Sequence, residues 1–197
     1  MMLTTLLAGC GGAKDNGGDK NADTIKLGFL GATTGGVANY GIPAQKGMQL
    51  AIDELNTAGG VLGKQLQPIY EDNKGDSSEI ANIATKYITQ DKVVAMIGDP
   101  CTGLTKVAAE IAQKNKVVVF SGGATGTGVV EIGDYIFRNT LLDQFAVPVV
   151  VDWMINKQGW KNIAIITSLN NGYSTALTPV FKQEIKNKGG KIVLEES

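Results

Sequence analysis

The chain has 197 residues, of which 43% are hydrophobic and 19% charged, a composition typical of a soluble globular protein with a buried core. Its net charge is −1, and Arg138 is the only arginine among eighteen basic residues. Both features argue against nucleic acids and phosphate-rich partners, for which a basic face and the bidentate contacts of arginine are preferred. The sequence has no histidine, which excludes histidine-based catalysis and most histidine metal sites.

The first ten residues form a short apolar stretch that ends at a cysteine. Leu7-Ala8-Gly9-Cys10 places small residues before this cysteine and resembles the lipobox of bacterial lipoproteins, in which the cysteine receives a lipid anchor. The stretch is shorter than the about 20 residues that span a bilayer. No Lys or Arg precedes Cys10, so we expect the natural start to lie upstream of Met1. The alternative is a chance cysteine in an ordinary apolar stretch.

Residues 11–23 are rich in Gly, Asp, Asn and Lys and contain almost nothing to bury. Such a composition cannot form a core, and it suits a flexible tether. We therefore expect residues 1–10 to be a truncated signal with a lipobox and residues 11–23 to link the anchor to a folded domain.

From residue 24 onward, short apolar runs alternate with amphipathic patterns. The runs typical of strands are residues 25–30, 66–70, 93–97, 117–120, 135–138, 163–166 and 192–194. Apolar residues at spacings of three and four predict helices within residues 44–55, 80–88, 104–112, 143–158 and 173–188, the second of them capped by Asp76 or Ser77. This alternation predicts an α/β fold, a Rossmann-like parallel sheet with helices on both faces.

The pattern starts again after the fifth predicted strand. A helix over residues 143–158 leads into a strand–helix–strand unit that cannot bury both its faces alone. We therefore expect a first α/β lobe over residues 24–142 and the start of a second, incomplete lobe over residues 143–197. The expected buried face of the helix over 143–158 carries Ala146, Val149, Val150, Trp153 and Met154.

Ligands of open parallel sheets bind beyond the carboxyl ends of the strands. Three loops rich in Gly, Ser and Thr occupy such places, at residues 31–41, 98–103 and 121–128. In the second loop, Thr102 precedes a predicted helix, whose N-terminus would attract a carboxylate, and it offers both an amide and a hydroxyl. The alternative is that Thr102 or Thr105 only caps its own helix.

Enzyme and cofactor motifs are missing from the glycine-rich segments. Residues 121–128 and 59–65 match neither a Walker loop nor a dinucleotide fingerprint, and no nucleophile elbow is present. Cys10 and Cys101 have no neighbour at the spacing of a metal site. We expect no enzymatic activity, no cofactor and no metal.

An ordered series of short segments resembles periplasmic binding proteins of the leucine/isoleucine/valine type. The series comprises residues 25–28, 34–36, 40–41, 47–56, 59–63, 97–105, 121–125, 137–138, 163–166 and 173. The resemblance covers roughly residues 24–197. It implies two α/β lobes, with a ligand that closes the cleft between them.

The resemblance also implies binding residues. The ligand carboxylate would meet Thr102, Thr125 and the backbone of Gly123 and Ala124, between aromatic walls from Tyr40, in the first loop, and Tyr173. Cys101 lies in the same loop as Thr102 and is included with the binding residues. Some members join this cysteine to another near Lys74; this sequence lacks the second, so we expect a lone thiol, and a small buried residue is its simplest role.

The resemblance finally implies a function. We expect an extracytoplasmic, lipid-anchored bacterial binding protein, monomeric, that delivers an amino acid, branched-chain or otherwise aliphatic, to the permease of an ABC transporter. The family's acidic partner for the ligand ammonium would lie beyond Ser197. The alternative is a two-lobe sensor for an amide, an amino acid or a small carboxylate, with a transmembrane helix or signalling domain beyond Ser197 or before Thr24.

Overall fold

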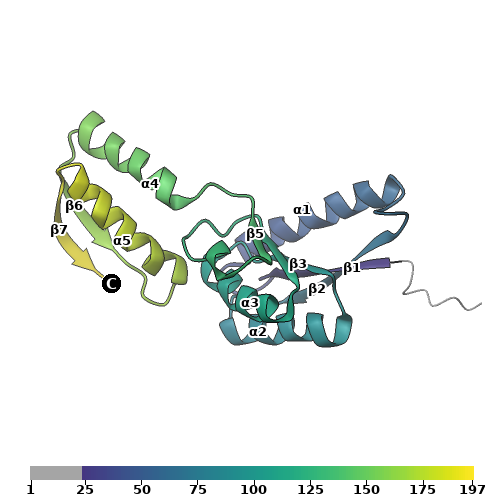
Figure 1. Ribbon diagram of the computed structural model, residues 1–197. Helices are drawn as coiled ribbons and strands as arrows, with labels where there is room; N and C mark the ends of the chain where they lie inside the picture. The colour runs from purple at the N-terminus through teal and green to yellow at the C-terminus, as the bar shows by residue number, and fades with distance from the viewer. Residues whose placement is uncertain (1–23) are drawn as a thin grey trace, which may run out of the picture.

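The computed structural model describes residues 24–197 (Figure 1). The expected lipidation site, Cys10, and the expected tether over residues 11–23 lie outside the described residues. Within residues 24–197, no helix combines the length and the apolar character needed to cross a membrane.

The first part of the chain forms a five-stranded parallel sheet in the order β2-β1-β3-β4-β5. Its strands are β1 (Thr24–Gly31), β2 (Gln65–Asp72), β3 (Ala95–Gly98), β4 (Val118–Ser121) and β5 (Ile136–Arg138). Its helices are α1 (Ala38–Thr57), α2 (Ser77–Lys86) and α3 (Thr102–Asn115), with the short turns η1 (Tyr87–Asp91) and η2 (Val130–Ile132). We call residues 24–138 the five-stranded unit; all of its predicted strands and helices are confirmed.

Helices cover both faces of this sheet, as the continuous apolar strands predicted. Neighbouring residues of β1 point to opposite faces: Phe29 packs with Met48 and Ile52 of α1, whereas Leu30 packs with residues of α2 and α3. In Figure 1, α1 accordingly lies on one side of the strands, and α2 and α3 lie on the other.

The strand order turns around between β1 and β3. The chain moves outward from β1 to β2 and then returns past β1 to β3, β4 and β5, so the loops after β1 and β3 leave the sheet in opposite directions. Such a reversal opens a crevice at the carboxyl edge of the sheet. The loops predicted to bind ligand meet at this edge.

The remaining residues build a second, smaller unit. It consists of α4 (Asp143–Asp152), the π-helical turn η3 (Trp153–Lys157), β6 (Asn162–Ile166), α5 (Gly172–Asn187) and β7 (Lys191–Glu196). Strands β6 and β7 pair in parallel and form a separate two-stranded sheet. We call residues 143–196 the two-stranded unit; in Figure 1 it extends to the left of the five-stranded unit.

The expectation about the buried face of the α4 segment is wrong in large part. The buried face carries Val147, Val151 and Ile155; of the expected face, Met154 packs against this core, whereas Val149 is 69% exposed. This segment is apolar on several sides, so periodicity alone could not select the face that packs.

The expected first loop is also shorter than predicted. Helix α1 begins at Ala38, so Tyr40 stands in its first turn rather than in the loop. Gly41 allows this early start, because a Cβ atom there would lie 1.9 Å from the Ala32 carbonyl oxygen. Pro43 also lies near the start of α1, where a proline is tolerated.

Candidate functional site

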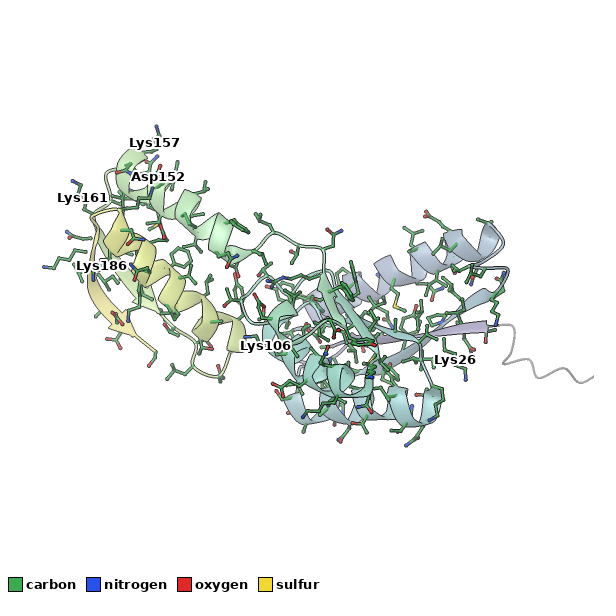
Figure 2. All side chains as sticks on the ribbon, viewed as in Figure 1. Lys26, Lys106, Asp152, Lys157, Lys161 and Lys186 are labelled. Carbon is green, nitrogen blue, oxygen red and sulfur yellow. The ribbon has the colours of Figure 1, made fainter. Side chains whose placement is uncertain are left out.

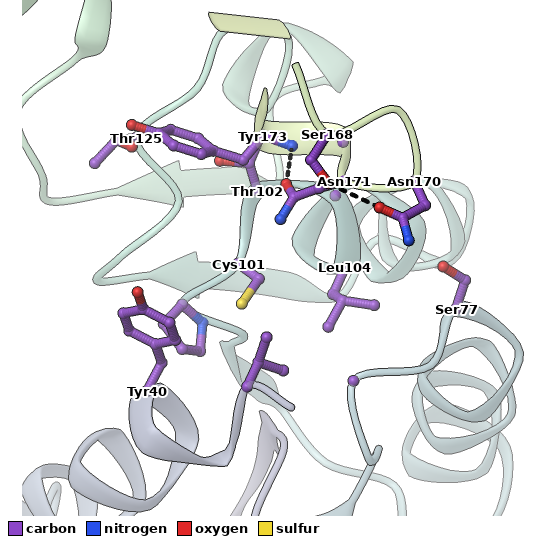
Figure 3. A pocket seen from close by; sticks show the side chains of 15 residues that line it. Tyr40, Ser77, Cys101, Thr102, Leu104, Thr125, Ser168, Asn170, Asn171 and Tyr173 are labelled. Atoms are coloured by element: carbon purple, nitrogen blue, oxygen red, sulfur yellow. Dashed lines mark hydrogen bonds between the residues drawn. The ribbon is translucent and has the colours of Figure 1, made fainter. Parts of the chain in front are cut away.

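A cleft of about 740 Å³ lies between the two units at the carboxyl edge of the larger sheet. Figure 3 shows residues of both units lining it: Tyr40 from α1, Cys101 and Thr102 from the start of α3, and Tyr173 from α5. Five of the seven residues predicted to bind ligand line the cleft, namely Tyr40, Cys101, Thr102, Thr125 and Tyr173. Gly123 and Ala124 do not line it.

Thr102 is the first residue of α3 and is almost completely buried. Its hydroxyl accepts a hydrogen bond from the Gly126 amide at 3.1 Å, so the hydroxyl proton remains available to a ligand. No side chain caps this helix, because Cys101 occupies the cap position without such a bond. The simple capping role considered for Thr102 is therefore not what the structure shows, and the first turn of α3 keeps uncapped amides.

Thr105, the other residue considered as a cap, has a different partner. Its hydroxyl donates to the Asp99 carbonyl oxygen at 2.6 Å, and the side chain is fully buried. Thr105 therefore binds the loop that precedes α3 and does not face the cleft.

Tyr173 brings the two-stranded unit to the opposite wall. Its hydroxyl lies 3.4 Å from Oδ1 of Asp143, and Figure 3 shows its ring extending toward Thr125. Burial, and next the negative charge of Asp143, raise the pKa of Tyr173, while hydrogen bonding with Thr125 acts in the opposite direction. The tyrosine is therefore a neutral hydroxyl at neutral pH.

The backbone of Gly123 and Ala124 is engaged within its own loop. Both amides donate to the Ser121 hydroxyl, at 3.4 Å and 3.1 Å. The Ala124 carbonyl accepts a hydrogen bond from the Arg138 guanidinium at 3.1 Å. These groups support the wall of the cleft and do not form its surface in this structure.

Charged side chains that do not line the cleft bond to the backbone of its loops. Asp72, at the end of β2, accepts hydrogen bonds from the amides of Thr33, Thr34 and Lys74. Burial alone would raise the pKa of Asp72, but these bonds and one from the Thr34 hydroxyl together hold it far below its usual range. Arg138, the single arginine, donates to the carbonyls of Ala124 and Gly126 and fixes the loop after β4.

The cleft surface itself is neutral. None of the fifteen residues described as lining it is Asp, Glu, Lys or Arg. Lysines of the two-stranded unit such as Lys157, Lys161 and Lys186 project from its outer side, away from the other unit (Figure 2). Within the described part of the chain, no three His, Cys, Asp or Glu side chains gather as a metal site would require.

Cys101 is a free thiol among the described residues, as expected. Burial, and next the charge of Asp99, raise the pKa of Cys101 from 9.0 to about 12. The thiol is therefore protonated at neutral pH and is not an activated nucleophile.

Ten further lining residues were not named as binding residues, although Val37, Pro100 and Gly103 lie within the loops predicted to bind ligand. They are Val37, Gly75, Ser77, Pro100, Gly103 and Leu104 of the five-stranded unit, and Ser168, Asn170, Asn171 and Gly172 of the two-stranded unit. The last four follow β6, so the rule that selected loops after β1, β3 and β4 would have found them too.

The starts of two helices meet across the cleft. Gly103 of α3 and Gly172 of α5 approach so closely that a Cβ atom on Gly172 would lie 3.1 Å from the Gly103 Cα atom. Asn171 caps α5, because its side chain accepts hydrogen bonds from the amides of Tyr173 and Ser174. Glycine at both positions permits this contact between the two units.

Known proteins resemble this chain in sequence and in fold. A family model described as "Periplasmic binding protein" matches residues 24–197. The leucine-, isoleucine-, valine-, threonine- and alanine-binding protein of Pseudomonas aeruginosa is 30% identical over 176 residues, which are 89% of this chain and 47% of that protein. The chain thus spans about half the length of the curated relatives that it matches.

Two solved structures share its architecture. The branched-chain amino acid transporter substrate binding protein LivJ from Streptococcus pneumoniae, in complex with isoleucine, is 36% identical with a TM-score of 0.80, over 88% of this chain and 49% of that one. A solute binding protein of an ABC transporter from Rhodopseudomonas palustris, in complex with 3,4-dihydroxybenzoic acid, is 28% identical with a TM-score of 0.79, over 88% and 47%. From the match over residues 24–197 and these likenesses, we conclude that the chain belongs to the periplasmic binding protein family.

Proposed function

We propose that this chain is part of an extracytoplasmic substrate-binding protein of an ABC transporter, and that it binds an aliphatic amino acid. The observation that carries the proposal is the neutral cleft between two α/β units, with hydroxyls and an uncapped helix start on one wall. Residues 24–142 and 143–197 would belong to two lobes that close on the ligand. Relatives named for leucine, isoleucine and valine support this reading over the sensor alternative.

The ligand carboxylate is proposed to bind at the start of α3. The Thr102 hydroxyl, the uncapped amides of the first turn and the Thr125 hydroxyl provide donors without a full positive charge. A helix N-terminus with such donors suits a single carboxylate. Gly123 and Ala124 would join these donors only if their loop opened toward the ligand.

The proposal that the ligand carries an amino group is supported by Asp143. Its Oδ2 atom is buried and has no hydrogen-bond partner among the described residues, while Oδ1 faces the Tyr173 hydroxyl at the edge of the cleft. A buried carboxylate oxygen without a hydrogen-bond partner favours a nearby cation. It therefore favours an amino acid over an aromatic acid such as the one bound by the Rhodopseudomonas palustris protein.

The mechanism is proposed to be binding without catalysis. Tyr40 and Tyr173 would enclose the aliphatic side chain, and contact with both walls would favour the closed arrangement. The relatives are binding proteins of transport systems, and the protonated Cys101 thiol gives no nucleophile. No cofactor is proposed.

Delivery to a membrane permease completes the proposal. The protein would act as a monomer on the outer side of the cytoplasmic membrane, held by a lipid on Cys10 and by the tether over residues 11–23. The family match supports an extracytoplasmic place, and the lipobox sequence carries the anchor. Labelling of growing cells with a fatty acid tests the anchor, since Cys10→Ser should abolish incorporation.

A thermal-shift screen tests the ligand, using the full natural sequence without its lipid signal. The panel contains leucine, isoleucine, valine, 4-methylpentanoate and 3,4-dihydroxybenzoate. A ligand at 100 times its Kd should add about 2.7 kcal/mol to the free energy of unfolding. Selective stabilisation by the amino acids is expected. A shift with 3,4-dihydroxybenzoate alone would overturn the proposed substrate, and no shift at all would contradict the proposed function.

A further inference from the structure

A buried polar network lies beneath the cleft, at the ends of β2, β3 and β4. Its centre is Asp99, which directly follows β3 and is 1% exposed. Its Oδ1 atom accepts a hydrogen bond from the Cys101 amide at 2.7 Å, and its Oδ2 atom accepts one from the Asn73 side-chain amide at 2.8 Å. The carboxylate therefore joins its own loop to the loop that follows β2.

Asn73 is also fully buried, and its orientation follows from a second bond. Its Oδ1 atom accepts a hydrogen bond from the Gly75 amide at 2.9 Å, so its NH₂ group must face Asp99. Gly75 lines the cleft, as does Cys101 on the other side of the network. The Asn73–Asp99 pair thus connects two parts of the cleft surface.

The main chain of Asp99 extends the network to a third loop. Its carbonyl oxygen accepts hydrogen bonds from Thr105 Oγ1 at 2.6 Å and from Ser121 Oγ at 3.0 Å. Ser121 Oγ in turn accepts the Ala124 amide, which precedes the cleft residue Thr125. One residue is therefore bonded to three of the loops that form the cleft.

The Asp99 carboxylate has no opposite charge beside it. None of the salt bridges within residues 24–197 includes Asp99. Burial raises the pKa of Asp99, and the bonds from Asn73 and Cys101 offset this only in part. A buried carboxylate without an ion-pair partner is unfavourable for folding, so stability alone does not account for an acid at this position.

We propose that Asp99 is a positioning residue for the ligand carboxylate. By joining Asn73 to the Cys101 amide, it holds the loop after β2 against the start of α3. It thereby fixes the direction in which the Thr102 hydroxyl and the first amides of α3 face the ligand. The inference rests on the proposed function, because it takes the ligand carboxylate to bind at Thr102.

The hydrogen bond between Asn73 and Asp99 has a defined donor and acceptor, so its role can be tested by exchanging the two side chains. Asp99→Asn leaves an NH₂ group that faces either the Asn73 NH₂ group or, if the new amide is rotated, the Cys101 N–H, so one hydrogen bond is lost in both orientations. Rotating the Asn73 amide would only leave the Gly75 amide without its acceptor. Asn73→Asp places two carboxylates face to face. The double variant N73D/D99N can restore all three hydrogen bonds: donor and acceptor are exchanged between residues 73 and 99, while the Gly75 and Cys101 amides still donate.

Leucine affinity is measured by calorimetry on the full natural sequence, at a temperature where circular dichroism shows every variant folded. Each single variant should bind about tenfold more weakly at pH 7.5, and the double variant should bind within about threefold of the wild type. For N73D, affinity should recover as the pH falls, because one of the facing carboxylates then takes up a proton. The Cys101 thiol, with a pKa of about 12, stays protonated over this range.

Asn156→Asp is the matched control. Asn156 donates to Asp152 at 2.8 Å, an Asn–Asp pair of the same length that lies exposed on the two-stranded unit. Its substitution should change neither the affinity nor its pH dependence. A double variant as weak as the single ones, or single variants that bind like the wild type, would overturn the inference.

Hydrogen exchange separates this inference from the proposed function. The Gly75 and Cys101 amides should exchange faster in both single variants and should regain protection in the double variant, with no ligand present. If the wild type binds no amino acid, the proposed function fails, and the exchange data still decide the role of Asp99. Unchanged exchange in the single variants would then refute it.

Discussion

The two walls of the cleft are held in different ways. On the five-stranded unit, Asp72, Asp99 and Arg138 bond to the cleft loops from behind. On the two-stranded unit, the loop before α5 is exposed from Ser168 onward, and there its hydrogen bonds are local: Ser168 Oγ donates to Asn170, and the Ser168 amide donates to Ser174. Thr167, next to β6, bonds to Glu196 of β7 and to Thr178 of α5. Only the first wall is anchored in a buried core.

This difference indicates that the two walls bind the ligand at different stages. Donors that are already fixed bind a charged group without further ordering, so the five-stranded unit suits the first contact with the ligand carboxylate. A wall held by local bonds can move as a body and add contacts afterwards. We call the cleft surface of the five-stranded unit the fixed wall and that of the two-stranded unit the movable wall. The two walls should respond differently to substitution.

Removing the hydroxyls of the fixed wall should have the largest effect. In T102V/T125V, each lost hydrogen bond to a charged group is expected to weaken leucine binding by about 1.5–3 kcal/mol, which together is at least about a hundredfold in Kd. Calorimetry measures the affinity. Thr85→Val is the control, because its hydroxyl bonds to a carbonyl within the exposed surface of α2. Unchanged affinity in the double variant would contradict the assigned carboxylate site.

Blocking the movable wall should have an intermediate effect. Gly172→Leu places a side chain against Gly103, where even a Cβ atom lies at 3.1 Å, so the units cannot approach fully. An overpacked contact costs about 1–3 kcal/mol, and we expect roughly thirtyfold weaker binding through faster dissociation, measured by stopped flow. Gly47→Leu on α1 is the control, since nothing lies within 4 Å of its added Cβ atom. Equal dissociation rates in both variants would argue against closure at this contact.

The Cys101 thiol reports on the rigidity of the fixed wall. Because burial raises its pKa from 9.0 to about 12, the thiolate fraction at pH 9 is much smaller than in the unfolded chain. In a Cys10→Ser background, alkylation by iodoacetamide at pH 9 should be at least about tenfold slower in the folded protein than in denaturant. D99N, which removes the neighbouring charge, should speed the reaction. Equal rates in the folded and unfolded chain would show that this wall opens freely.

Much of the fixed wall could be predicted from the sequence, because its signals are local. Periodicity located α2 and α3, and the strand-end rule located the loops that carry Thr102 and Thr125. The network beneath them could not be predicted. Asn73 and Asp99 have no local pattern that pairs them, and their bond exists only because β2 and β3 flank β1 in the sheet.

The movable wall was harder to predict for two physical reasons. The contact of Gly103 with Gly172 depends on how two separate sheets are placed, which no short-range pattern encodes. The helix α4 is apolar on several sides, so its period did not reveal that Val147 and Val151 face the core. Tyr40 shows the same limit on the first wall: α1 starts before it, and Gly41 permits this start through a close approach to Ala32 that no local pattern encodes.

The smallest effect on leucine affinity is expected from removing the N-terminal cap of α5, on the movable wall. Asn171→Ala removes the acceptor for the Tyr173 and Ser174 amides, a loss of about 1 kcal/mol in the local stability of α5. Since Tyr173 is anchored in that first turn, its looser placement should weaken leucine binding by about threefold, with faster exchange of the α5 amides. Asp76→Ala removes the equivalent cap of α2, whose side chain accepts from the Ser78 and Glu79 amides. It should loosen α2 by a similar amount but leave affinity nearly unchanged, because the bonds of Asp72 and Asp99 still hold the fixed wall. If the two caps affect affinity equally, the walls do not differ in the way described.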